Sequence, residues 1–61
     1  MIVNTDQGRY YINDRNVISI RNITASEKNM ITLQDCKTLI SVIGGSFYCK
    51  NSFEELVEIS R

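Results

Sequence analysis

The sequence contains no histidine, proline or tryptophan, and it has only two cysteines. Without histidine, the Ser-His and Cys-His pairs that activate nucleophiles cannot form, and the common zinc-ligand sets are incomplete. Cys36 and Cys49 show no CxxC spacing and no signal peptide precedes them, so we expect two buried free thiols in a reduced, cytoplasmic environment. We therefore predict a protein that is not an enzyme and that needs no metal or cofactor.

The sequence also lacks an excess of charge of either sign, because 7 Lys and Arg residues balance 7 Asp and Glu residues. This balance disfavours nucleic acid as a partner, since binding to the phosphate backbone depends on clustered positive charge. No run approaches the roughly 18 apolar residues that span a bilayer, so we expect no membrane insertion. If nucleic acid were bound, the cationic groups would be Arg21, Lys28, Lys37 and Lys50.

The chain has 61 residues, which predicts a single small domain over residues 1–61. A chain of this size buries only about 60% of the surface that its unfolded form exposes. The absence of proline removes one common guard against pairing between the exposed edges of sheets. We therefore expect association into a homodimer or a larger homo-oligomer.

Short runs of Ile, Val, Thr and Tyr, separated by polar or glycine-containing turns, dominate the first fifty residues. This spacing predicts a mainly β fold, because short connections join antiparallel strands whereas parallel strands need long crossovers. We predict an antiparallel meander of five to six short strands with one short C-terminal helix packed on the sheet. The expected strands are residues 1–4, 9–13, 17–24, 30–33, 38–43 and 46–50, and the expected helix is residues 53–60.

The Gly44-Gly45 pair predicts a two-residue β-hairpin with a type I′ turn, because both central positions of that turn need a positive φ. In this register Val42 lies opposite Phe47, and Ile40 lies opposite Cys49, all on one face. The other face carries Leu39, Ile43 and Tyr48, which form our predicted oligomer interface.

A helix is predicted to begin after Ser52, which has a glutamate three residues later in the pattern of a capping box. Phe53, Leu56 and Val57 follow with helical spacing and form an apolar stripe. So short a helix does not persist alone in water, so we expect the sheet to hold it in place.

Cationic and aromatic residues lie close together near the start of the chain. Such a group can stack on a base, a nucleotide or a side chain of a partner protein. The alternative is that one tyrosine fills the core and another covers it. The predicted binding residues are Arg9, Tyr10, Tyr11, Arg15 and Tyr48.

The segments GRYYIN and TLISVIGGSFYCKNSFEEL, with Ile18 and Ile20 between them, resemble the small flagellar FlbD-type proteins. That resemblance covers about two thirds of the chain, whereas residues 22–36 are expected to form an additional hairpin. The front half of LytTR-type DNA-binding domains has a related pattern. The FlbD resemblance implies a small non-enzymatic accessory factor of the flagellar motor. It assigns no functional residue to this sequence. The matching positions are Thr38, Ile40, Ser41, Gly45, Lys50, Ser52, Glu54 and Glu55.

Together these features favour a β-rich binding module that regulates or inhibits a partner protein by occupying its surface. A second hypothesis is an oligomer that sequesters a small nucleotide-like ligand between Arg9, Arg15, Tyr10 and Tyr11. Very small phage-encoded anti-defence proteins include both types. A flagellar accessory factor is the further alternative.

Overall fold

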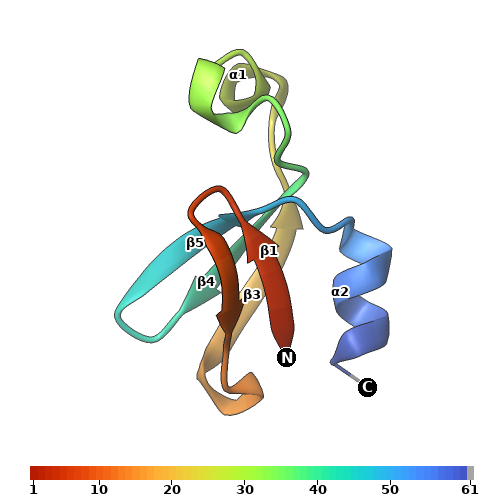
Figure 1. Ribbon diagram of the computed structural model, residues 1–61. Coiled ribbons are helices and arrows are strands. Elements are labelled where there is room, and N and C mark those ends of the chain that lie inside the picture. The colour runs from red at the N-terminus through yellow and green to blue at the C-terminus, as the bar shows by residue number, and fades with distance from the viewer. Residues whose placement is uncertain (61) are drawn as a thin grey trace.

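The computed structural model describes residues 1–60 and shows a five-stranded antiparallel sheet with several short helices (Figure 1). The strands lie in the order β2-β1-β5-β4-β3. A mainly β fold with a helix near the C-terminal end was predicted, and the structure confirms both. The strands are β1 (Ile2–Thr5), β2 (Gly8–Tyr11), β3 (Val17–Asn22), β4 (Thr38–Val42) and β5 (Gly45–Cys49). The helices are α1 (Ala25–Lys28) and α2 (Phe53–Ile59), with 3-10 turns η1 (Asp14–Asn16) and η2 (Ile31–Leu33).

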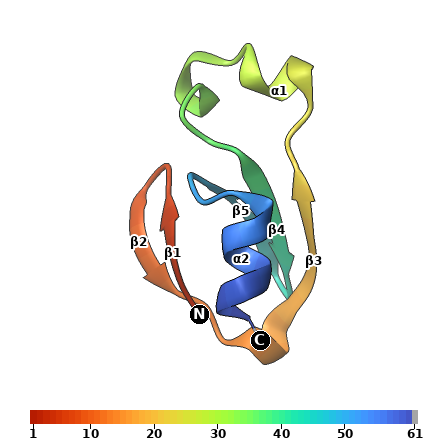
Figure 2. The same cartoon turned by 90° about the vertical axis from the view of Figure 1, so that its right-hand side faces the viewer.

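The sheet is strongly curved. Consecutive strands β2 and β3 lie at opposite edges of the sheet, although only residues 12–16 connect them. Across a flat sheet these two edges would be about 19 Å apart. Three of the connecting residues are wound into the 3-10 turn η1, which rises only about 2 Å per residue. The connection is therefore short for a flat sheet, and curvature brings the two edges closer together. The curvature creates a concave side, and Figure 2 shows α2 placed there between the β1–β2 hairpin and β3.

The α-amino group of Met1 fastens this connection to β1. It donates hydrogen bonds to the carbonyl oxygen of Ile12 at 2.7 Å and to Oδ1 of Asp14 at 2.8 Å. The bond to Asp14 is also an ion pair. These contacts hold the turn at η1 against the start of β1, which helps to keep the two edges of the sheet close.

The core lies between the concave side of the sheet and α2. Leu56 of α2 is fully buried there with residues from β1, β4 and β5. Cys36 and Cys49 are free and buried, as predicted, and burial raises the pKa of the Cys49 thiol to about 11. Burial also raises the pKa of the Cys36 thiol, and a raised pKa disfavours the reactive thiolate form of both residues. The buried cluster consists of Met1, Val3, Ile12, Ile40, Cys49 and Leu56. No helix in residues 1–60 is long and apolar enough to cross a membrane.

The hairpin of β4 and β5 has a different turn from the predicted one. Val42 pairs with Gly45, so the turn consists of Ile43 and Gly44, and Ile40 pairs with Phe47. Ile43 has no positive φ and Gly44 has φ +93°, which fits a type II turn, whereas the predicted type I′ turn would need a positive φ at Gly45 as well as at Gly44. The predicted pairing was therefore wrong by two residues. A shift of two leaves every side chain on its predicted face, because faces alternate with a period of two.

The predicted strand at residues 30–33, and the hairpin expected over residues 22–36, are wrong. This region contains α1 and the 3-10 turn η2, and β3 ends at Asn22. Thr24 caps α1 in a complete capping box with Glu27, which starts a helix where a strand was expected. Leu33 and Cys36 are buried with a helix-like spacing of three residues. Figures 1 and 2 both show this part, residues 23–37, as a lobe beyond the end of the sheet.

The capping box that was predicted for the C-terminal helix is present. The Ser52 hydroxyl accepts from the Glu55 N–H at 3.1 Å, and the Glu55 carboxylate accepts from the Ser52 N–H at 3.0 Å. These backbone and hydroxyl contacts lower the pKa of Glu55. The helix runs from Phe53 to Ile59, close to the predicted residues 53–60.

Replacing Ser52 by alanine is expected to destabilise the fold by about 1 kcal/mol, because one N–H of the first turn loses its partner. For a domain of this size, that loss corresponds to a decrease of about 4 to 8 °C in Tm. Thermal unfolding followed by circular dichroism measures the change. Ser26→Ala, at an exposed position of α1, is the matched control and should leave Tm nearly unchanged. Equal Tm values for both variants would contradict the capping role of Ser52.

Candidate binding pocket

A pocket of about 300 Å³ lies between the β1–β2 turn and the middle of β5. This volume is at the lower end of the range for ligand sites and is large enough for one long side chain. Six residues line the pocket: Asp6, Gln7, Tyr10, Ser46, Phe47 and Tyr48.

The pocket exists because β1 and β5 pair over a very short length. Their ladder has a single register pair, Thr5 with Cys49. Beside it, the Asp6 N–H donates to the Tyr48 carbonyl at 3.2 Å, and the Lys50 N–H donates to the Asn4 carbonyl at 2.7 Å. Earlier residues of β5 therefore pair with β4 but have no ladder partner in β1. Because side chains alternate along a strand, this open edge presents Phe47 on one face and Ser46 and Tyr48 on the other.

The β1–β2 turn places Asp6 and Gln7 at the rim of the pocket. Thr5 pairs with Gly8 across the turn, and Gly8 has φ +116°, which a residue with a side chain rarely adopts. The Thr5 hydroxyl donates to the Gly8 carbonyl at 2.8 Å and accepts from the Gln7 N–H at 3.1 Å. Thr5 itself is buried, so these hydrogen bonds hold the turn from the buried side of the sheet.

Two aromatic rings form one wall. The ring centroids of Tyr10 and Phe47 are 5.7 Å apart with a tilt of 35°, a usual geometry for a favourable aromatic pair. Tyr10 is 41% exposed, so part of its ring is open to solvent. Tyr10 pairs with Val3, a core residue, and this pairing holds its backbone in place.

Asp6 gives the pocket its charge. Its side chain is exposed and has no hydrogen bond or ion pair to any other residue among residues 1–60. None of the six lining residues is cationic, so the pocket carries one negative charge at neutral pH. A carboxylate beside aromatic rings attracts cations and repels anions.

The structure brings together only part of the predicted binding group. Tyr10 and Tyr48 line the pocket. Arg9 and Tyr11 occupy alternate positions of β2 and so lie on its other face, where Arg9 is paired with Asn4. Arg15 is in η1, which follows the opposite end of β2 from the pocket.

The predicted interface residues are also separated. Leu39 is half-buried and lies directly opposite Tyr48, so these two share a face. Ile43 is 70% exposed and lies in the turn at the other end of the hairpin. The three residues therefore do not form one continuous patch.

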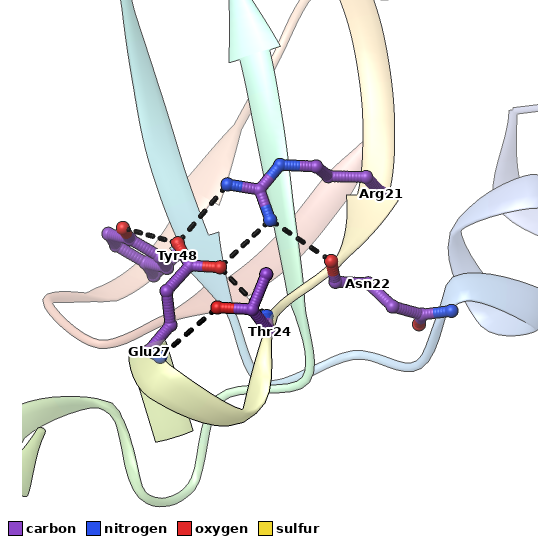
Figure 3. Close-up of polar contacts among 5 residues, drawn as sticks. All are labelled: Arg21, Asn22, Thr24, Glu27 and Tyr48. Atoms are coloured by element: carbon purple, nitrogen blue, oxygen red, sulfur yellow. Dashed lines mark hydrogen bonds and ion pairs between the residues drawn. The ribbon is translucent and has the colours of Figure 1, made fainter. Parts of the chain in front are cut away.

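A polar network beside the pocket ties the lobe of residues 23–37 to the sheet (Figure 3). Arg21 of β3 donates to both carboxylate oxygens of Glu27, at 2.8 and 3.2 Å. The Tyr48 hydroxyl donates to Glu27 at 2.8 Å, and the Thr24 N–H also donates to it at 2.8 Å. These donors, with Arg21 the strongest, hold the pKa of Glu27 far below its usual range. The hydrogen bond to Glu27 also raises the pKa of the Tyr48 hydroxyl.

Sequence reasoning missed four lining residues and the role of Glu27. The four lining residues are Asp6, Gln7, Ser46 and Phe47. The sequence pattern offered one usable signal, the Thr24-x-x-Glu27 spacing of a capping box. Comparisons with protein-family models, curated proteins and solved structures found no match.

Proposed function

We propose that this protein is a non-catalytic binding module that regulates or inhibits a partner protein by occupying part of its surface. The observation that carries the proposal is the pocket at the open edge of β5, where an unpaired carboxylate lies beside one exposed aromatic ring, Tyr10, and two half-buried ones, Phe47 and Tyr48. Residues that dominate binding energy are typically aromatic and lie in or around such depressions. The pocket is therefore a suitable anchor point for one protruding side chain of a partner.

Rigidity of the pocket supports the same function. The rim is set by the Thr5 hydrogen bonds, and the wall is set by the pairing of Tyr10 with buried Val3. Tyr48 is fixed by its bond to Glu27. Preformed sites lose less conformational entropy on binding than mobile ones do. A surface held in this way suits recognition better than catalysis, because the pocket contains no nucleophile with an adjacent base.

Self-association is part of the proposal. Several large apolar side chains are well exposed, including the cross-strand pair of Ile2 and Tyr11. A homo-oligomer would cover some of them. The exposed apolar residues outside the pocket are Ile2, Tyr11, Ile18, Met30, Ile31, Ile43 and Ile59.

The alternative function, sequestration of a nucleotide-like anion, receives less support from the geometry. Arg9 and Arg15 do not reach the pocket, and Asp6 would repel a phosphate there. An anion site would need arginines from two copies of the chain. The role of a flagellar accessory factor stays a prediction and is compatible with a non-catalytic binding module.

Site-specific photo-crosslinking in the cells that naturally express the protein tests the proposal. We would place p-benzoylphenylalanine at Ser46 in the pocket, and at Ser19 on β3 as the matched control. We expect one defined crosslinked protein from position 46 that is weak or absent from position 19. The crosslink should disappear when Tyr10→Ala is added, because that change removes one aromatic wall. Capture of only a second copy, or equal labelling from both positions, would contradict the regulatory role of the pocket.

A further inference from the structure

We propose that the pocket receives a basic side chain of the partner, with arginine preferred over lysine. This inference deepens the proposed function and rests on it, because it names the chemistry of the group that the partner presents. It depends on three observations: the unpaired carboxylate of Asp6, the exposed ring of Tyr10 packed against Phe47, and the absence of any cation among the lining residues.

The charges around the pocket leave Asp6 available. The arginine of the polar network, Arg21, already uses two nitrogens on Glu27. Lys50 directly follows β5, forms no ion pair with Asp6 and is not among the lining residues. Within residues 1–60, no cationic side chain is therefore placed to neutralise Asp6 from inside the pocket. An incoming cation gains a charge-assisted hydrogen bond that the protein itself does not supply.

The aromatic groups favour the same kind of ligand. The faces of tyrosine and phenylalanine rings attract cations, and a planar guanidinium can also stack on them. The Tyr48 hydroxyl is occupied by Glu27, so Tyr48 contributes mainly its ring. Arginine is preferred because its fork of N–H groups can bond a carboxylate while its plane lies on a ring, whereas the ammonium of lysine is a compact point charge.

The size of the pocket agrees with one long side chain. A volume of about 300 Å³ accommodates a guanidinium with part of its aliphatic stem. Because the pocket is open at the edge of β5, the backbone of the partner need not enter it. The remaining contacts of the partner would then lie on the strands around the pocket, which carry their own polar groups.

The test is an NMR titration of the full-length protein with three peptides: acetyl-Gly-Arg-Gly-amide, its lysine analogue and its citrulline analogue. Citrulline keeps the shape of arginine and removes its charge. We expect saturable shifts of the Gln7, Tyr10, Phe47 and Tyr48 amides with the arginine peptide, at a Kd of the order of millimolar, since the peptide is small. Lysine should bind more weakly, and citrulline about tenfold more weakly or not measurably. Inorganic phosphate should shift none of these signals.

Two variants assign the effect to the pocket. Asp6→Asn should weaken binding of the arginine peptide about tenfold, because the side chain loses its negative charge and one of its two acceptor oxygens. Glu58→Gln removes one exposed negative charge from α2 and should leave the Kd unchanged. The proposal is overturned if citrulline binds as well as arginine, if phosphate binds instead, or if no peptide gives saturable shifts. It is also overturned if both variants weaken binding equally. The crosslink at position 46 would then still decide whether the pocket contacts a protein.

Discussion

The Leu56→Ala variant is expected to lose about half of the stability of the protein. Leu56 is fully buried and is the buried residue of α2 that joins the core cluster. Truncation of a core leucine to alanine costs about 2 to 5 kcal/mol, because apolar contacts are lost and a cavity remains. At about 0.05 to 0.15 kcal/mol per residue, a chain of this length has a total stability of only about 3 to 9 kcal/mol. Urea unfolding followed by circular dichroism measures the loss.

Ile59→Ala is the matched control for this experiment. Ile59 lies on the same helix but is 42% exposed, so its truncation removes a similar number of atoms from a partly solvated position. We expect the control to cost about 1 kcal/mol or less. The two variants change helix propensity similarly, so the difference between them reports the burial of Leu56. A loss for Leu56→Ala no larger than that for Ile59→Ala would mean that α2 does not close the core.

The Glu27→Gln variant is expected to loosen the lobe of residues 23–37 while the sheet stays intact. Glutamine keeps the shape of glutamate but removes its charge, and its amide nitrogen cannot accept a hydrogen bond, so one oxygen must replace the two that now accept from Arg21, Tyr48 and Thr24. We expect amide hydrogen exchange in residues 24–37 to become about tenfold faster, since charge-assisted bonds are about twice as strong as neutral ones and several change together. Exchange in β4 and β5 should change little.

The same variant should also change the response to acid. The pKa of Glu27 in the folded protein lies below its ordinary value of 4.5. The stability that this carboxylate contributes is therefore present in full above that value and is lost as the pH falls toward the folded pKa. Wild-type protein should lose more stability than Glu27→Gln between neutral pH and pH 3. The pKa of the capping carboxylate of Glu55 is also lowered. The stability of both the wild type and Glu27→Gln therefore keeps the pH dependence that Glu55 contributes.

Glu54→Gln is the control for both measurements, because Glu54 is exposed in the first turn of α2 and takes no part in the network. It should leave exchange in residues 24–37 unchanged. If Glu27→Gln shows wild-type exchange in the lobe, or if its stability falls with acid as steeply as that of the wild type, the network does not hold the lobe.

The two capping boxes show how far local sequence patterns reach. Ser52 and Glu55 were recognised because an apolar stripe with helical spacing follows them. Thr24 and Glu27 have the same spacing, but Met30, Ile31 and Leu33 resemble a strand because aliphatic and β-branched residues favour sheets. In the structure the cap determines the start of a short helix, and two buried residues, Leu33 and Cys36, follow with a spacing of three. The β propensity of residues 30–33 was therefore a weaker signal than the capping box of Thr24 and Glu27.

The hairpin of β4 and β5 shows that faces are easier to predict than register. Alternation placed Ile40, Val42, Phe47 and Cys49 on one side, and the structure agrees. The position of the turn within Ile43-Gly44-Gly45 was ambiguous, because either glycine can adopt a positive φ. Only Gly44 does so. Alternation alone cannot detect a pairing error of two residues, because such a shift leaves every side chain on the same face.

The pocket could not be predicted from the sequence. It depends on where β1 leaves β5, and a single register pair, Thr5 with Cys49, sets that point. Contacts between strands distant in the sequence have no local signature. The aromatic residues Tyr10 and Tyr48 were singled out for their chemistry, but their partner Asp6 becomes distinctive only when no cation is found beside it.

The two sulfur atoms lie near each other at the junction of the lobe and the sheet, where the N–H of Lys37, next to Cys36, donates to the Cys49 carbonyl at 2.8 Å. Cys49 belongs to the central cluster, whereas Cys36 belongs to the lobe that Glu27 fastens to the sheet. A peroxide or another thiol can reach either sulfur only after the residues above it move away. Since the lobe is held by fewer buried contacts than the core, Cys36 comes within reach first. Oxidative damage to this protein should therefore begin in the lobe and reach the central strands only later.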